Sequence, residues 1–217
     1  MATNETMSVC AFDTLLTRNV PHILEKIFFA VDYKSFKKCQ EVSMTWNQLL
    51  TSESFRKIGK FVFREDIEKD LWSAIVWDNV DEVRRILSNG MVEVNCESDL
   101  RKLGYSHTGA ILCYSRRMGM RIETPLYYAA RMGRKEVVQL LIERGAEPNW
   151  QHWSEMTPLH MAAGLGHSDV VKVLMDAGAD LNKVGMWGYT PLSIARVRVH
   201  KDVVNMLRDA GAQGCHC

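Results

Sequence analysis

The sequence predicts an all-α fold in which a small helical module precedes a helical solenoid. Three observations carry this prediction. The tripeptide Thr-Pro-Leu begins at residues 124, 157 and 190, so that its three copies follow one another at a constant interval. Each copy is followed by matching apolar positions and closes with a Gly-Ala pair. The chain from residue 1 to residue 60 lacks this period and has a helical pattern of its own.

Each repeated unit is expected to fold as two helices. Threonine accepts a hydrogen bond at a helix start, and proline suits the first helical position. Ala129, Ala162 and Ala195 are small enough for the first helices to approach closely. A Val-Val pair with a leucine four positions after its first valine forms the apolar stripe of the second helix, and glycine ends it. The predicted units are residues 124–156, 157–189 and 190–213.

The repeated units resemble ankyrin repeats, because they combine a Thr-Pro-Leu-His start at residues 157–160 with an alanine pair and a closing Gly-Ala. A degraded copy at residues 69–96 replaces Thr-Pro by Lys69-Asp70, as a polar end unit would. In the last unit Arg196 replaces the second alanine and Val199 replaces the glycine between the helices, which indicates the C-terminal cap. The positions kept in the degraded copy are Leu71, Ala74, Val83, Ile86 and Gly90.

An insertion at residues 97–123 separates the first unit from the second, because the equivalent positions Leu71 and Leu126 lie farther apart than one repeat period. It combines arginine, lysine, tyrosine and histidine. Insertions in repeat arrays form loops on one face, often the binding face. Two interpretations remain open here: a solvated loop, or a basic loop that contacts a partner.

Residues 13–58 are expected to form a separate module of three short helices. Its apolar faces include Ile23, Val31, Phe36 and Leu49. About 45 residues bury little surface alone, so the module is expected to lean on a partner. Residues 59–68 read as a helical, semi-rigid linker because they contain no proline or serine-rich run. Residues 214–217 form a tail.

The string from residue 20 to residue 49 resembles an F-box, which docks on a Skp-type adaptor and through it on a cullin ubiquitin ligase. Val20 stands where leucine is usual, which loses one methylene and about 0.8 kcal/mol of burial. His22-Ile23 replaces a more common pair ending in glutamate. The adaptor-binding residues that the resemblance implies are Val20, Pro21, Leu24, Ile27, Phe28 and Trp46.

Motifs for catalysis and for cofactors are missing from the sequence. It contains no Gly-x-Ser-x-Gly elbow, no phosphate-binding glycine loop and no paired zinc pattern. We therefore expect no catalytic residue, no cofactor and no metal. His160 is expected to bond neighbouring backbone and Thr157. The ending Cys215-His216-Cys217 could be prenylated or hold a metal weakly, but a frayed tail is favoured.

Charge and hydropathy point away from nucleic acid and membrane as partners. The chain carries 27 basic and 26 acidic residues, and no apolar run approaches a membrane span. The amino terminus lacks a secretion signal, and the six scattered cysteines suit free thiols. A cytoplasmic or nuclear location is expected.

The resemblance to ankyrin repeats also implies a binding groove, formed by hairpin loops and by the exposed face of each first helix. Trp150 is expected to pack on the array, whereas Trp153 and Trp187 are expected to contact a partner. Arg131 and Arg198 would suit carboxylates of a ligand. The residues expected to bind substrate are Met120, Arg121, Arg131, Trp153, Met156, Leu165, Trp187, Tyr189 and Arg198. Glu123, Met132, Ser154, Met186 and Val197 are expected in the same groove.

Together these features predict a substrate-recognition subunit of a Skp, cullin and F-box ubiquitin ligase. The amino-terminal module would bind the adaptor, and the groove would hold the target protein. A different class remains open, in which the chain is an ankyrin scaffold or inhibitor without ligase function. A host-directed effector that redirects a ligase is also possible.

Overall fold

The computed structural model describes residues 34, 64–99, 122–152 and 154–214. The predicted module at residues 13–58 lies outside these residues except for Lys34, as do the tail beyond Gly214 and residues 59–63 of the linker. Leu71–Arg84 and Glu93–Cys217 together form one compact unit, whose described residues carry the argument below.

The described residues are mostly helical, which confirms the predicted all-α class. Helix α6 spans Arg64–Val76 and α7 spans Val80–Ser88. The three regular units contain α9 (Pro125–Met132) with α10 (Lys135–Glu143), α11 (Pro158–Leu165) with α12 (Ser168–Asp176), and α13 (Pro191–Val197) with α14 (Lys201–Asp209). A short 3-10 helix, η1 (Met186–Gly188), precedes α13.

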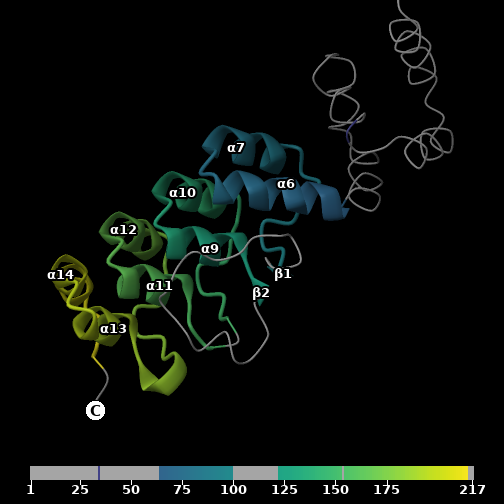
Figure 1. Ribbon diagram of the computed structural model, residues 1–217. Coiled ribbons are helices and arrows are strands. Elements are labelled where there is room, and N and C mark those ends of the chain that lie inside the picture. Colours follow the sequence, from purple (N-terminus) through teal and green to yellow (C-terminus); the bar gives the residue numbers. More distant parts are fainter. Residues whose placement is uncertain (1–33, 35–63, 100–121, 153, 215–217) are drawn as a thin grey trace, which may run out of the picture. The chain divides into compact units, whose positions relative to one another are not determined.

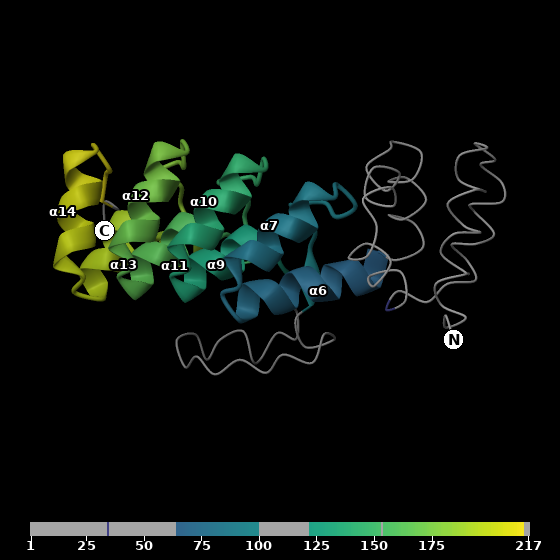
Figure 2. The same cartoon turned by 90° about the horizontal axis from the view of Figure 1, so that it is seen from above.

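The three regular units stack so that their helices form two layers (Figures 1 and 2). Helix α11 packs against both α9 and α13, while α12 packs against α10 and α14. The alanines at the equivalent position of each first helix, Ala129, Ala162 and Ala195, are completely buried between these helices. Stacking therefore buries apolar faces that one unit could not bury alone.

The first helix of each regular unit starts at a threonine cap, as the sequence predicts. The side chains of Thr124, Thr157 and Thr190 accept hydrogen bonds from backbone N–H groups three residues later, at 3.3, 3.4 and 3.3 Å. Proline follows each threonine at the first helical position. These caps satisfy donors that a helix start otherwise leaves open.

Two histidines join neighbouring units at the glycines between their helices. His167 Nε2 donates to the Arg131 carbonyl and His200 Nε2 to the Gly164 carbonyl, both at 3.1 Å. A Cβ added to Gly133 or Gly166 would lie within 3 Å of the respective ring. His167 and His200 therefore link each unit to the one before it.

The insertion differs from the predicted loop at both of its ends. Strands β1 (Ser98–Asp99) and β2 (Ile122–Glu123) pair antiparallel, with Ser98 opposite Glu123. The paired ends close the insertion at its base, and residues 100–121 between them lie outside the described residues.

The degraded first unit keeps its predicted core. Leu71, Ala74, Val83 and Ile86 are all buried. Its first helix is longer than those of the other units, because α6 has no Thr-Pro start and runs without a break across the predicted boundary at residue 68. In place of a proline start, Glu65 and Asp66 in its first turn suit the positive end of the helix dipole.

Replacing Val199 by glycine should stabilise the protein. Val199 has a φ of +63° at the position where Gly133 and Gly166 adopt similar angles. This region is costly for a β-branched residue, and the side chain is 70% exposed, so little packing is lost. We expect Val199→Gly to raise the free energy of unfolding by about 1 kcal/mol in urea titrations. Val204→Gly, inside α14, should lower it instead.

Candidate protein-binding surface

The predicted substrate-binding residues divide into described and undescribed sets. Arg131, Met156, Leu165, Tyr189 and Arg198 lie in the stacked units, and Trp187 lies in η1. The others lie outside the described residues, together with every residue implied for adaptor docking. They are Met120, Arg121, Trp153, Val20, Pro21, Leu24, Ile27, Phe28 and Trp46.

Two hairpin loops, at residues 152–156 and 185–189, project from the array at equivalent positions. The first is closed by a hydrogen bond from His152 N to Met156 O at 3.0 Å, and the second by one from Gly185 N to Tyr189 O at 2.8 Å. Met186 N also donates to Ser154 O at 3.2 Å, which ties the two loops together. The backbone therefore holds this face of the array in a defined arrangement.

Three asparagines bond the backbone of the neighbouring unit after its second helix, and the sequence analysis gave them no role. Asn149 Oδ1 accepts from Asp180 N at 2.7 Å, while its Nδ2 donates to Gly178 O at 3.3 Å. Asn95 makes the same two bonds to the backbone of the following unit, and Asn182 Oδ1 accepts from Gln213 N at 2.6 Å. Asn149 and Asn182 lie one repeat period apart, so the period alone could have identified them.

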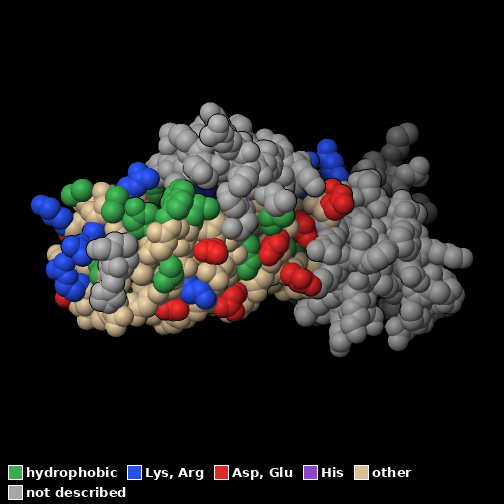
Figure 3. Space-filling model, turned by 90° about the horizontal axis from the view of Figure 1, so that it is seen from below, with side chains coloured by type: hydrophobic (Ala, Val, Ile, Leu, Met, Phe, Trp, Pro, Cys, Tyr) green, Lys and Arg blue, Asp and Glu red, His purple; other side chains and the backbone are tan. Residues whose placement is uncertain are grey.

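Large apolar side chains are exposed in the hairpins and at the ends of the first helices. Trp187 is 62% exposed and Val197 is 64% exposed, with Met132 and Val184 also exposed. Figure 3 shows hydrophobic side chains gathered on this side of the unit, with lysine and arginine at the end that holds α13 and α14. Exposed apolar groups beside cations are typical of a protein-binding surface.

Trp187 adopts a backbone conformation that is rare for its residue type. Its φ of +60° lies in the left-handed region. Hydrogen bonds on either side hold it there, from Gly188 N to Gly185 O at 3.1 Å and from Tyr189 N to Met186 O at 3.4 Å. Strained backbone conformations cluster at ligand-binding sites, so Trp187 is a candidate contact residue.

Met156 and Leu165 lie deeper than the groove prediction requires. Met156 is buried in an apolar cluster with Tyr127 and Met161, and Leu165 packs against that cluster. Tyr189 is half-buried, and its carbonyl accepts a hydrogen bond from His160. These residues pack beneath the exposed surface of the hairpins. The prediction that Met156 contacts substrate is therefore wrong, because Met156 is a core residue.

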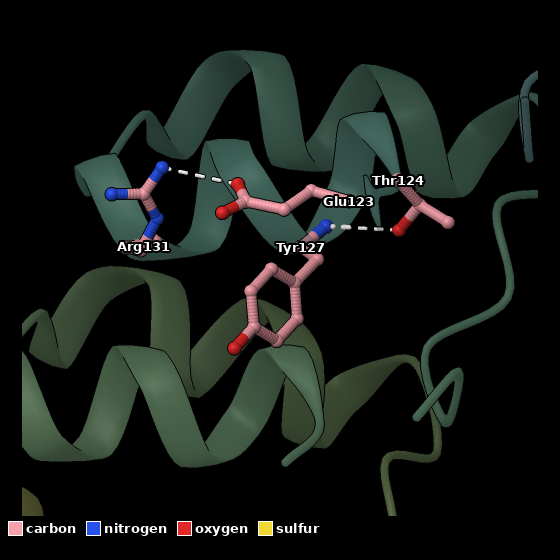
Figure 4. Close-up of polar contacts among 4 residues, drawn as sticks. All are labelled: Glu123, Thr124, Tyr127 and Arg131. Atoms are coloured by element: carbon pink, nitrogen blue, oxygen red, sulfur yellow. Dashed lines mark hydrogen bonds and ion pairs between the residues drawn. The ribbon is translucent and has the colours of Figure 1, made fainter. Parts of the chain in front are cut away.

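Arg131 does not offer an unpaired charge to a ligand, contrary to the sequence prediction. Its Nη2 lies 3.0 Å from Glu123 Oε2, and both side chains are largely buried (Figure 4). The guanidinium also lies over the Tyr128 ring, 4.9 Å from its centroid. A buried charge without a partner is costly, and the Glu123 carboxylate supplies the partner of Arg131 from within the chain.

Trp150 packs on the array, which confirms the prediction for this residue. Its ring meets Tyr127 edge to face at 5.6 Å, and its Nε1 donates to Glu97 Oε1 at 2.9 Å. The His152 ring stacks on the Tyr127 ring, with the two centroids 5.0 Å apart. Burial raises the pKa of Tyr127 above its ordinary range, and nearby Glu123 adds to this rise.

Both hairpin-facing histidines are held neutral by the fold. Burial, with a smaller contribution from Arg131, lowers the pKa of His152 to about 4. Its Nδ1 accepts from Ser154 Oγ at 2.9 Å. Burial likewise lowers the pKa of His160 to about 4, against opposing hydrogen bonds to the Tyr189 and Lys183 backbone.

His160 has the structural role that the sequence predicts. Its Nδ1 accepts from the Thr157 backbone N–H at 3.1 Å, which completes a capping box with the threonine side chain. Its Nε2 donates to the Tyr189 carbonyl at 3.1 Å. His160 thus joins the start of α11 to the next hairpin.

The described residues add three observations on chemistry and environment. Within them, no group of three or more His, Cys, Asp or Glu residues could hold a metal ion. Cys96 is the cysteine among them; it is buried and forms no disulfide. No helix in this part of the chain has both the length and the apolar character needed to cross a bilayer.

Comparison with protein families agrees with the stacked units. A family model for three copies of the ankyrin repeat matches residues 68–184 and 126–216. No curated protein matches the chain. Ankyrin repeats indicate a protein-protein interaction module, in agreement with the exposed apolar loops. The chain belongs to the ankyrin repeat family.

Proposed function

We propose that this protein is the substrate receptor of a Skp, cullin and F-box ubiquitin ligase. Residues 13–58 would dock on the Skp-type adaptor, and the ankyrin units would hold the target protein. The observation that carries the proposal is the F-box-like string at residues 20–49 in the same chain as an ankyrin array.

The described surface supports the target-binding half of the proposal. The loops at residues 152–156 and 185–189 are tied together, and they carry an exposed tryptophan beside exposed aliphatic groups. Preorganised loops bind with a smaller entropic cost than flexible ones. A receptor of this kind needs no catalytic residue, because holding a lysine-bearing target near charged ubiquitin makes the transfer effectively intramolecular.

A plain ankyrin scaffold or inhibitor is the second candidate function. It is favoured by one observation: the ankyrin match covers residues 68–216, and residues 13–58 lie outside it. A scaffold would use the same loops but would bind no ligase adaptor. Adaptor binding therefore separates the two candidates.

Co-purification with a Skp-type adaptor tests the proposal. We expect the full chain to bind the adaptor, and we expect Leu24→Asp with Trp46→Ala to abolish binding, because a charge and a cavity would replace two apolar docking contacts. Trp187→Ala is the matched control, since it removes an aromatic ring from the ankyrin surface and should leave adaptor binding intact. Adaptor binding unaffected by Leu24→Asp with Trp46→Ala, or absent from the wild type, would refute the ligase function.

A further inference from the structure

Charge is distributed unevenly along the ankyrin units. Residues 183–214 hold five lysines and arginines against two aspartates, a net charge of +3. In contrast, residues 157–182 hold one lysine against three aspartates, a net charge of −2, and residues 124–156 are balanced at four against four. The whole chain carries only +1, so the positive charge is a local feature of the last unit.

Two cations at the C-terminal end of α13 remain available to a ligand: Arg196 within the helix and Arg198 at its C-cap. Both are exposed, and neither forms an ion pair within the described part of the chain. Arg131 occupies the same repeat position as Val197, two units earlier, but its charge is neutralised by Glu123. Arg196 stands where Ala130 and Ala163 are buried, and it stays exposed because no described helix packs beyond α13 and α14.

Exposed apolar residues accompany these cations at the same end of the array. Val184 is 54% exposed, and the more exposed Trp187 and Val197 lie in η1 before α13 and at the last residue of α13. Because equivalent positions of stacked helices lie side by side, Arg198 continues the row that begins with Met132 and Leu165. We call Val184, Trp187, Arg196, Val197 and Arg198 the C-terminal docking surface.

We propose that the C-terminal docking surface binds an extended acidic segment of a partner protein, with apolar side chains between its carboxylates. Guanidinium groups bind carboxylates through strong, paired hydrogen bonds. Trp187 and Val197 offer apolar area that would be buried by aliphatic or aromatic groups of the segment. A nucleic acid is disfavoured, because the surface has two arginines among three apolar residues and the whole chain is nearly neutral.

This inference rests on the proposed function only in taking the ankyrin surface as the target-binding site. It specifies the class of target segment that the surface selects. The adaptor experiment reports on residues 13–58 alone. Failure of the ligase proposal therefore leaves the docking inference intact, and the reverse also holds. Adaptor binding without acidic selection would overturn the inference alone, and acidic selection without adaptor binding would overturn the ligase function alone.

Selection from a phage-displayed library of random dodecapeptides against the full chain tests the inference. Enriched peptides should contain several Asp or Glu residues and at least one large apolar residue. Their affinity, measured by fluorescence anisotropy with synthetic copies, should fall about tenfold or more in Arg196→Glu with Arg198→Glu, because attraction becomes repulsion. Val197→Asp should weaken binding of the same peptides through a second, apolar contribution.

The matched control makes the same charge change on the other helix layer. Lys201→Glu with Arg208→Glu in α14 alters the net charge equally and should change affinity by less than about twofold. Thermal unfolding of each variant checks that the exposed substitutions leave the fold intact. Selection of neutral or basic peptides overturns the inference, as does an equal loss in the α14 control. Tighter binding of a single-stranded oligonucleotide, lost in the same α13 variant, would assign the surface to nucleic acid instead.

Discussion

Acidification from about pH 7 to about pH 5 should lower the free energy of unfolding by about 2 kcal/mol through His160 alone. Burial lowers the pKa of this residue to about 4 in the folded protein, whereas an unfolded histidine has a value of 6.5. The folded state therefore binds fewer protons than the unfolded state between these two values. The contribution of His160 to the free energy of unfolding is fully present above pH 6.5 and is lost as the pH falls toward 4.

His152 should add to the same pH dependence, because burial lowers its pKa to about 4 as well. Its share is expected to be smaller, since it lies in an exposed loop and is less completely buried than His160. Both residues bond through Nδ1 as acceptors, to the Thr157 N–H and to the Ser154 hydroxyl. Protonation would remove the acceptor in each case, which would weaken the cap of α11 at Thr157 for His160 and the hairpin contact with Ser154 for His152.

Urea titrations at several pH values measure this effect in the wild type and in His160→Gln. Glutamine can still complete the capping box with Thr157, but it does not titrate. We expect the variant to be less stable at pH 7, and we expect its deficit to shrink by about 2 kcal/mol at pH 5. Leu159→Val, at the neighbouring position of α11, should keep the wild-type pH dependence. An unchanged deficit for His160→Gln at both pH values would contradict the assignment.

Replacing Gly166 by alanine should destabilise the protein by about 2–4 kcal/mol. Gly166 has a φ of +75°, and an added Cβ would lie 2.5 Å from His200 Nδ1. The ring cannot move away freely, because its Nε2 is bonded to the Gly164 carbonyl. Backbone strain and the loss of the link between units therefore act together.

Gly178→Ala provides the matched control for this prediction. Gly178 lies in the same unit and has a φ of +80°, but nothing lies within 4 Å of an added Cβ. Its substitution should cost only the backbone term, about 1 kcal/mol. In the double variant Gly166→Ala with His200→Ala, the added cost of the alanine should fall to the Gly178 value. Equal costs at the two glycines in the wild-type background would show that the His200 contact is unimportant.

The repeat period predicted most of the array, because ankyrin units depend on local signals. Threonine caps, proline at the first helical position and buried alanines act within one unit, and each is readable from spacing alone. His160 was predicted in the same way, since a histidine three residues after a threonine cap can complete a capping box. The docking residues from Val20 to Trp46 stay a prediction, because they lie outside the described residues.

The candidate site was less predictable, because its residues are defined by contacts between units. Glu123 occupies the position of Met156 and Tyr189, so the repeat pattern predicted exposure in the groove for all three. In three dimensions Glu123 neutralises Arg131, and Met156 fills a cluster beneath the hairpin. Neither outcome follows from sequence spacing.

By itself, the sequence determined the number and order of the regular units and the ends of their helices. It also predicted that Trp187 lies exposed in a hairpin loop as a partner contact, because a solvated hairpin has no packing need for a tryptophan. Only the tertiary structure decided which of the groove arginines keeps its charge available. Arg131 and Arg198 look alike in sequence, yet Arg131 lies beside a buried carboxylate, whereas Arg198 lies exposed in the last unit. Charge pairing depends on which groups are adjacent in space, and stacking of the units determines that adjacency.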